Sequence, residues 1–122
     1  MTPPPPAAPA KRARLTRAAE FDAVQRLGRA VGGRYVTVRY RRRDDDAPAR
    51  VGFAVPRQVG GAVERNAVKR RLHEVVDQDP ALLRPGFDYV VIARGGIAEP
   101  LEGHGLDWLR AQVVELLDRI PA

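Results

Sequence analysis

The stretch VGGAVERNAVKRRLHEVV, residues 59–76, predicts a helix over residues 62–77 with one buried side and one cationic side. A helix turns by about 100° per residue, so residues three and four apart share a side. The apolar sector comprises Val68, Leu72, Val75 and Val76. A neighbouring sector of about 140° carries hydrogen-bond donors, namely Arg65, Asn66, Lys69, Arg70 and His73. The helix can therefore bury one side while several donors face solvent.

The donor sector suits phosphate groups. Donors at spacings of three and four can meet successive phosphates along a nucleic-acid strand. The helix N-terminus adds free N–H groups and a positive dipole end, and Gly60 and Gly61 permit close approach of the backbone. Glu64 and Glu74 fall outside the donor sector, which leaves its cations largely unneutralised. The pattern favours a polyanion interface, and an ordinary solvated charged face is the alternative.

The charge of the whole chain supports the same interpretation. The formal net charge is +6, but the charge is unevenly distributed. Residues 1–71 contain 17 Lys and Arg against 6 Asp and Glu, whereas residues 72–122 contain 4 against 9. A large polyanion is the natural partner of such a basic half.

Size and composition exclude several classes of protein. A chain of 122 residues suits one domain with one modest core and leaves no room for a separate catalytic domain. No apolar run approaches the roughly 20 residues that a membrane span needs. The segment MTPPPPAAPAKRAR, residues 1–14, lacks the apolar region of a secretory signal. Cysteine is absent, which removes disulfides and thiolate chemistry. We expect a cytoplasmic protein with no membrane partner.

The chain divides into a tail and one domain. Residues 1–13 are rich in Pro and Ala and then basic, which predicts a disordered tail. Residues 14–122 form one predicted α/β domain, which is expected to bind a polyanion. Its first helix should span residues 17–27, with Thr16 as the N-cap and Gly28 as the stop. Phe21, Val24 and Leu27 share one side of this helix.

Alternating or apolar runs predict strands at 29–33, 34–43, 50–57 and 88–94, and a last helix covers 106–120. In the second strand Val36 and Val38 point one way, and Thr37 and Arg39 point the other. Strands 34–43 and 50–57 should pair as an antiparallel hairpin. The run 88–94 is apolar on both faces, which fits a central strand. The pattern predicts an α+β fold, a two-layer α/β sandwich in the order α-β-β-β-α-β-α with a mixed four-stranded sheet.

Catalytic patterns are absent from the sequence. Gly60 to Arg65 matches neither GxxxxGK[ST] nor GxGxxG, which argues against a nucleotide-binding enzyme. No Ser/His/Asp or HExxH spacing occurs. His104 lies in a glycine-flanked predicted loop, and the turn Asp44–Asp46 is expected to be solvated. We therefore expect no catalytic and no metal-ligating residue in the chain itself.

The run RVGFAVPRQVGGAVERNAVKRR, residues 50–71, resembles the signature region of the bacterial ribonuclease P protein component. In that family an RVG strand and a cationic turn lead into G-x-A-V-x-R-N-x-x-K-R on a helix. RLTRAAEFDAVQRLG at 14–28 and YVVIAR at 89–94 resemble its opening helix and last strand, so the resemblance covers roughly residues 12–120. It implies a protein subunit that assists a catalytic RNA in removing the 5′ leader of precursor tRNA. The RNA subunit would hold the reacting Mg²⁺, and no protein partner would be required.

The resemblance also implies roles for individual residues. Those expected to bind the RNA subunit are Arg57, Arg65, Asn66, Lys69, Arg70 and His73. A cleft between the first helix and the sheet would hold the single-stranded leader, and its expected residues are Phe21, Val24, Val36 and Val38. Core packing is the alternative for Phe21. Ala67 and Gln25 depart from the family pattern, which has Arg and an aromatic residue there. The family further implies a left-handed βαβ crossover, against a general right-handed preference of about 98%.

Two other functions fit the same sequence. One is a ribosomal-type structural RNA-binding protein without a role in catalysis. The other is a nonspecific DNA-binding module, because phosphate contacts alone carry no information about sequence or sugar.

Overall fold

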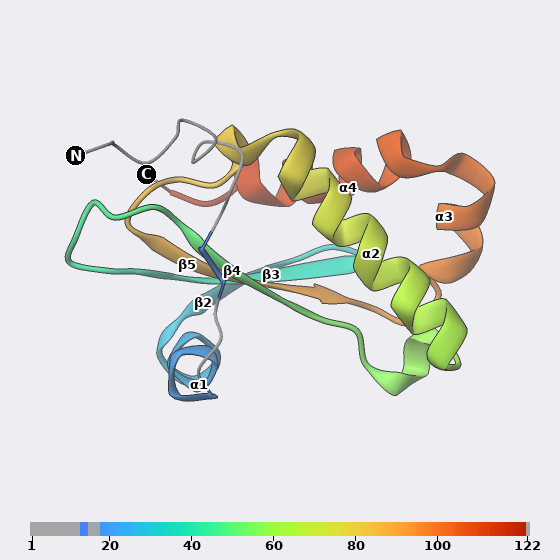
Figure 1. The fold of residues 1–122 in the computed structure, drawn as a ribbon, viewed down its shortest axis with the longest axis horizontal. Helices are drawn as coiled ribbons and strands as arrows, with labels where there is room; N and C mark the ends of the chain where they lie inside the picture. Colours follow the sequence, from blue (N-terminus) through green and yellow to red (C-terminus); the bar gives the residue numbers. More distant parts are fainter. Residues whose placement is uncertain (1–12, 15–17, 122) are drawn as a thin grey trace, which may run out of the picture.

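The computed structural model describes residues 13–14 and 18–121 (Figure 1). One mixed sheet runs through it in the strand order β1-β4-β5-β3-β2. Its strands are β1 (Ala13–Arg14), β2 (Arg29–Gly32), β3 (Val36–Arg42), β4 (Arg50–Ala54) and β5 (Phe87–Ala93). β1, β4 and β5 are mutually parallel, whereas β3 is antiparallel to β5 and to β2. The short β1 adds a fifth strand to the four that were predicted, and it places Ala13 in the sheet.

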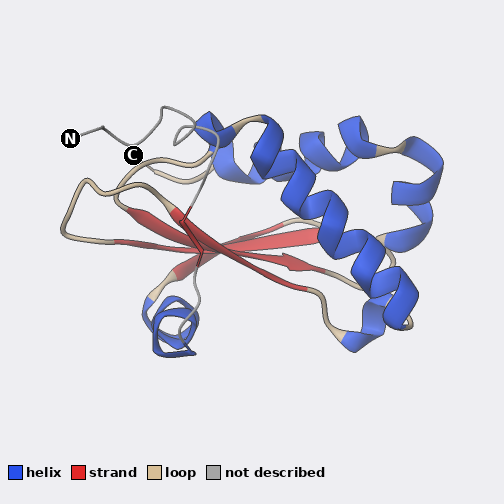
Figure 2. Ribbon diagram, in the orientation of Figure 1, coloured by secondary structure: helices blue, strands red, loops and turns tan. Residues whose placement is uncertain are grey.

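The helices are α1 (Ala18–Leu27), α2 (Ala62–Gln78), α3 (Ala98–His104) and α4 (Leu106–Asp118). Two short 3-10 turns, Arg57–Val59 and Pro80–Leu82, flank α2. Figure 2 shows α2, α3 and α4 on one side of the sheet and α1 on the other. The predicted α+β class and the order of its elements are confirmed. The sheet with α2 to α4 forms the predicted sandwich, and α1 adds one helix on the opposite face.

The predicted hairpin between β3 and β4 is wrong, because β5 lies between these two strands. Val91 of β5 is opposite Val38 of β3 on one side and Phe53 of β4 on the other. Every residue of β5 except Ile92 is buried. A strand that is apolar on both faces buries the most apolar surface at the centre of a sheet. This gain outweighs the preference for a hairpin that the short connection between β3 and β4 would otherwise create.

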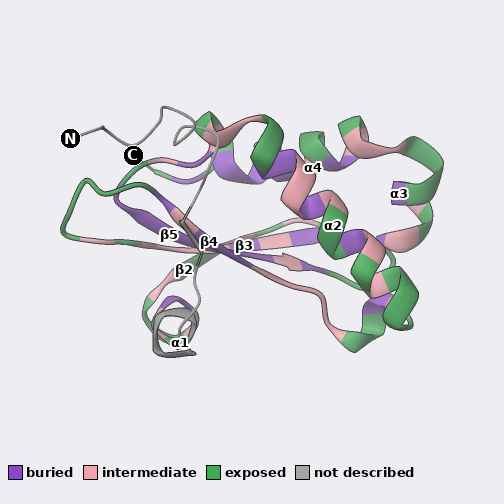
Figure 3. Ribbon diagram, viewed as in Figure 1, coloured by how far each residue is buried: buried purple, intermediate pink, exposed green. Residues whose placement is uncertain are grey.

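The main core lies between the sheet and the layer formed by α2 and α4, where buried segments face one another in Figure 3. The predicted apolar sector of α2 is buried here, with Val68, Leu72, Val75 and Val76 at 2% exposure or less. α4 contributes Leu109, Val113, Leu116 and Leu117. Inside this core the backbone N–H of Arg84 donates to the hydroxyl of Tyr89 at 3.1 Å.

A second, smaller core lies under α1 on the other face of the sheet. Val24 and Val90 are fully buried there, and Ile92 packs against them. Leu27, predicted on the same side as Val24, is instead 62% exposed. α1 ends at Leu27 because the chain turns directly against β3: a Cβ at Gly28 would lie 2.5 Å from the carbonyl oxygen of Tyr40 in β3. This close approach fixes the end of α1 above the sheet.

α3 was not predicted, because residues 98–104 contain Pro100 and Gly103, which disfavour helix interiors. Pro100 is tolerated because it lies in the first turn, where backbone N–H groups have no helical partner. His104 is exposed, as expected, but it ends a helix instead of lying in a loop. The hand of the β4-α2-β5 crossover stays a prediction. Of the predicted tail, residues 1–12 lie outside the described residues, as do Thr16 and Arg17 of the predicted first helix.

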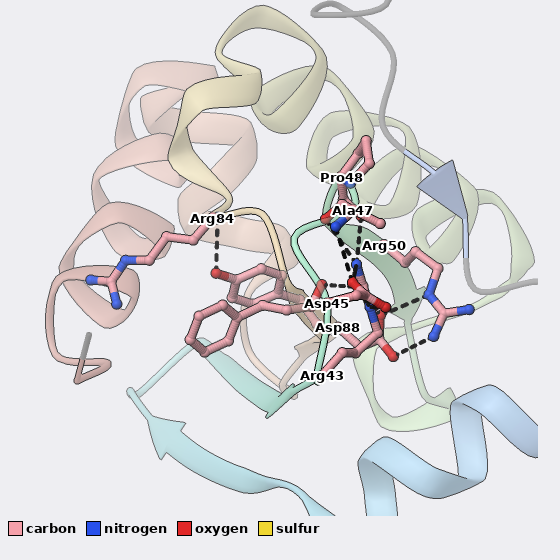
Figure 4. Close-up of polar contacts among 9 residues, drawn as sticks. Arg43, Asp45, Ala47, Pro48, Arg50, Arg84 and Asp88 are labelled. Atoms are coloured by element: carbon pink, nitrogen blue, oxygen red, sulfur yellow. Dashed lines mark hydrogen bonds and ion pairs between the residues drawn. The ribbon is translucent and has the colours of Figure 1, made fainter.

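An ionic cluster ties the loop between β3 and β4 to the start of β5 (Figure 4). Asp88 is only 1% exposed, and its two oxygens accept hydrogen bonds from Arg50 at 2.8 and 2.7 Å. Arg43 donates to Asp88, to Asp45 and to the carbonyl oxygens of Ala47 and Pro48. Burial alone would raise the pKa of Asp88, but the hydrogen bonds from Arg50 and Arg43 outweigh it and lower this pKa.

No helix among residues 13–14 and 18–121 combines the length and the apolarity that crossing a lipid bilayer requires.

The ionic cluster predicts a large effect for Asp88→Asn. The substitution removes the buried carboxylate that accepts hydrogen bonds from both Arg43 and Arg50, and we expect a loss of about 3 kcal/mol in the free energy of unfolding, measured by urea denaturation near neutral pH. Because the pKa of Asp88 is lowered, its contribution is complete above about pH 4 and is lost as the pH falls through the lowered pKa. The stability difference between wild type and variant should therefore narrow in acid.

Asp22→Asn is the matched control. Asp22 also pairs with an arginine, Arg26, at 2.9 Å, but both side chains are more than half exposed. The control should lose less than about 0.5 kcal/mol. Equal losses of stability in the two variants would show that the burial of Asp88 does not strengthen its ion pairs.

Candidate nucleic-acid interface

Local contacts fix the start of α2 and the side that it turns to solvent. The N–H of Gly61 donates to the carboxylate of Glu64 at 2.8 Å, and the N–H of Arg65 donates to the Gly61 carbonyl at 2.9 Å. Together with the buried sector, these bonds set the rotation of the helix about its axis. Asn66, Lys69 and Arg70 are consequently exposed, as the sequence predicted.

Two members of the predicted donor sector are partly buried. His73 packs its ring against Phe53 of β4, with ring centroids 4.2 Å apart. Arg65 borders the apolar sector, and its Nε is buried without a hydrogen-bond partner among the described residues. An unsatisfied buried donor costs free energy, which a shift of this side chain toward an incoming acceptor would relieve.

The cations along this side of the helix lack internal neutralisation. In the described part of the chain, no carboxylate forms an ion pair with Arg57, Arg65, Lys69 or Arg70. Arg110 and Arg119, by contrast, pair with Asp79 and Glu115 at 2.9 and 2.7 Å. Arg57 is exposed in the 3-10 turn just before α2. The group Arg57, Arg65, Asn66, Lys69 and Arg70 is named the basic stripe below.

A cleft of about 610 Å³ opens on the other side of the molecule, beside α1. Its walls come from α1, β3, β5 and the loops at one end of the sheet. The residues that line it include Gln25, Arg34, Thr37, Arg39, Gln58, Ile92 and Arg94. This feature is named the sheet cleft. Ile92 supplies an apolar patch of floor, and three arginines surround it.

Backbone carbonyls, not carboxylates, hold two of these arginines. Arg39 donates from Nη2 to the carbonyl of Gln25 at 2.6 Å, and its Nε is buried without a partner in the described part of the chain. Arg94 donates from Nη1 to the carbonyl of Gly33 at 2.6 Å. A carbonyl carries no net charge, so the positive charge of both guanidinium groups remains available to an anion in the cleft.

Three of the residues expected in a leader cleft are placed elsewhere. Val36 and Val38 lie opposite Ala93 and Val91 in the main core, on the face away from α1. Val24, a residue of α1, is fully buried against Val90 and does not line the cleft. Phe21 is part of α1, but its side chain lies outside the described residues. The sheet cleft is therefore more polar and more cationic than was predicted.

The alternation of β3 already contained the signal for part of this lining. Thr37 and Arg39 were assigned to the side opposite Val36 and Val38, and the structure confirms that separation. The error lay in the side to which α1 was assigned. Arg34 and Arg94 lie just outside β3 and β5, and Gln58 lies in a 3-10 turn, so the alternation of a strand does not fix the direction of these side chains.

In the described residues, no group of three or more His, Asp or Glu side chains is arranged to hold a metal ion. The expectation of Mg²⁺ in an assembly with RNA stays a prediction.

Comparisons with known proteins agree with these features. The family model described as Ribonuclease P matches residues 10–120. The Ribonuclease P protein component of Symbiobacterium thermophilum is 38% identical over 106 residues, which cover 87% of this chain and 89% of that protein. The protein of the same name from Caulobacter vibrioides is 45% identical over 82 residues, or 64% of this chain. That match spans about half of the relative, 55% of its length.

Solved structures extend the similarity to the fold. The RNase P protein from Thermotoga maritima aligns with a TM-score of 0.76 at 31% identity, covering 92% of this chain and 99% of that one. The Staphylococcus aureus RNase P protein aligns with a TM-score of 0.71 at 25% identity, covering 88% and 94%. Because the family model spans nearly all of the described residues, the chain belongs to the ribonuclease P protein family.

Proposed function

We propose that this chain is the protein subunit of a bacterial ribonuclease P. It binds the catalytic RNA subunit and the 5′ leader of precursor tRNA, and it assists the Mg²⁺-dependent removal of that leader. The observation that carries the proposal is the basic stripe, on and just before α2, whose cations form no ion pair with a carboxylate of the described residues, in a chain that belongs to this family.

The basic stripe is proposed to meet the phosphates of the RNA subunit. Each phosphate that Arg65, Lys69 or Arg70 neutralises releases counterions, which stabilises the complex and makes its affinity depend on salt. Asn66 adds a neutral donor and acceptor between these cations. His73 is included as a minor contributor, because its ring is partly buried against Phe53.

The sheet cleft is proposed to hold the single-stranded leader. Arg39 and Arg94 would meet backbone phosphates, and Ile92 would contact a base or sugar through its apolar side chain. Such contacts depend little on base identity, which suits leaders of varied sequence. Phe21 is proposed to stack on a base at the same cleft, and packing inside the α1 core is the alternative for its ring.

In this mechanism the chain positions RNA and lowers charge repulsion, and it performs no bond cleavage itself. When bound by the RNA subunit, Mg²⁺ supplies the activation of water for phosphodiester hydrolysis. The described residues offer no acidic cluster that fits this ion, so the proposal assigns no metal ligand to the chain. Arginines near the leader reduce the repulsion between two polyanions, which strengthens substrate binding most at low Mg²⁺.

The second candidate is a structural RNA-binding protein of the ribosomal type. The basic stripe alone would serve it equally well. The sheet cleft favours the first candidate, because a separate cationic cleft on the other side of the sheet suits a second RNA strand.

The first test concerns the basic stripe. The double variant Arg65→Ala, Lys69→Ala should bind the RNA subunit at least about tenfold more weakly at physiological salt, because charge-assisted hydrogen bonds are lost. The slope of log affinity against log salt should flatten by about two units, one for each phosphate contact. Filter binding over a salt series measures both quantities.

Arg119→Ala is the matched control, since it removes one arginine just after α4, where Glu115 already neutralises it. Its affinity and salt slope should equal those of wild type. If the double variant binds the RNA subunit as tightly as wild type does, α2 is not part of the interface.

The second test concerns catalysis. Mixing the chain with a bacterial ribonuclease P RNA and precursor tRNA at low Mg²⁺ should stimulate 5′ cleavage, as followed by gel electrophoresis of labelled substrate. The chain alone should cleave nothing, because no catalytic pattern occurs in it. A lack of stimulation would favour the structural RNA-binding candidate, and cleavage without RNA would contradict the assignment of the chemistry.

The third test concerns the sheet cleft. Arg94→Ala removes an exposed cation from the cleft wall, and we expect the holoenzyme to lose affinity for precursor tRNA with a leader of several nucleotides. Affinity for a substrate whose leader has been removed should stay unchanged. Equal losses for both substrates would indicate a general folding or RNA-subunit defect instead of a leader contact.

A further inference from the structure

We propose that a second pocket, beside α3, binds one base of the leader after the strand leaves the sheet cleft. The inference rests on the proposed function and extends it with a further binding site. It follows from the geometry of this pocket, from its aromatic and charged walls, and from its continuity with the sheet cleft.

The pocket has a volume of about 490 Å³, which lies within the roughly 300–1,000 Å³ of typical small-molecule sites. It is named the α3 pocket. It lies between the start of β3 and α3, and its walls include Arg34, Tyr35, Gly95, Glu99, Gly103 and His104. It is therefore large enough to accept a base.

Two rings at this pocket are supported by a third. Trp108 of α4 contacts Tyr35 edge-on, with centroids 5.1 Å apart and an angle of 65° between the planes. Trp108 also contacts His104, with centroids 6.0 Å apart and an angle of 31°. Tyr35 and His104 line the pocket, so each is held by Trp108 and can also meet a ligand. Rings fixed in this way provide stacking surfaces for a base at little cost in conformational entropy.

The charges of the pocket divide it into two parts. The guanidinium carbon of Arg34 lies 5.2 Å from the centroid of the Tyr35 ring, and no ion pair joins Arg34 to a carboxylate in the described residues. This group suits a phosphate beside the stacked base. Glu99 would repel a phosphate, but its oxygens can accept hydrogen bonds from the amino group of a base. The pocket thus orients a nucleotide with its phosphate toward Arg34.

The α3 pocket is continuous with the sheet cleft, because Arg34 and Gly95 line both. A strand that leaves the sheet cleft over Gly95 therefore reaches the α3 pocket next. Apart from the adjoining residues and the backbone of the same helix, no heavy atom of the described residues lies within 4 Å of a Cβ placed at Gly96 or at Gly103. The surroundings of both glycines are consequently open to a ligand.

The occupant that these features favour is the distal part of the leader. Affinity for precursor tRNA should therefore rise in two steps as the leader grows, first when it fills the sheet cleft and again when it reaches the α3 pocket.

Gly103→Leu tests the inference by filling the pocket. Beyond its own helix backbone and chain neighbours, a Cβ at this position meets no heavy atom of the described residues within 4 Å, and leucine favours a helix more than glycine does, so the variant should fold at least as well as wild type. Gly103→Ala is the matched control, which improves the helix but leaves most of the pocket open. Dissociation constants of holoenzymes made with each protein are measured for precursor tRNAs carrying leaders of increasing length.

The expected result is that Gly103→Leu removes only the second step, weakening binding of long leaders by about tenfold, the effect of losing one stacked base. Short leaders should bind all three proteins equally. His104→Ala should produce the same dependence on leader length, because it removes one of the two stacking rings.

Two outcomes would overturn the inference in distinguishable ways. If wild-type holoenzyme responds to leader length but Gly103→Leu binds long leaders as wild type does, the α3 pocket is not a leader site and the sheet cleft stands. If affinity does not depend on the leader at all in wild type, leader binding by this chain fails, and the α3 pocket fails with it.

Discussion

The burial of both faces of β5 is the constraint on which the rest of the molecule depends. A strand that excludes water on two sides needs a cover on each, and α2 with α4 provides one while α1 provides the other. The first cover turns the polar side of α2 outward and so creates the basic stripe. The second cover is a single short helix, which protects Val24 and Val90 but leaves the neighbouring part of the sheet open. The sheet cleft is the part that α1 does not cover.

Arginine has two roles in this fold, and the proximity of carboxylates decides which one applies. Arg43 and Arg50 surround the buried Asp88 and hold the loop between β3 and β4 against β5. Carboxylates of the protein itself neutralise the charges of these two arginines. The arginines of the basic stripe and the sheet cleft form no ion pair with a carboxylate of the described residues, so their charges remain available to an external anion. A simple count of basic residues, which gave the uneven charge of the two halves, does not separate these groups.

The sequence predicted those features that follow from periodicity. The apolar sector of α2, the alternation of β3 and the apolar run of β5 each reflect burial within one element, and all three are confirmed. The features that depend on contacts between elements were harder to predict. The hairpin was wrong because β5 competes for the same strand edges, and Val36 and Val38 were misassigned because alternation does not say which face α1 covers. α3 was missed because Pro100 and Gly103 have low helix propensity. In the folded protein, the first-turn position of Pro100 and tertiary contacts override that propensity.

The strand order also affects how the protein emerges from the ribosome. Both neighbours of β5 precede it in the chain. Val36 of β3, for example, cannot pair with Ala93 of β5 until that residue has been made. During translation β3 and β4 therefore remain without their shared partner until β5, residues 87–93, has been made. Residues 1–71, the basic half, are made before any of the acidic half that follows. Folding intermediates of this protein should thus attract polyanions before any finished binding surface exists.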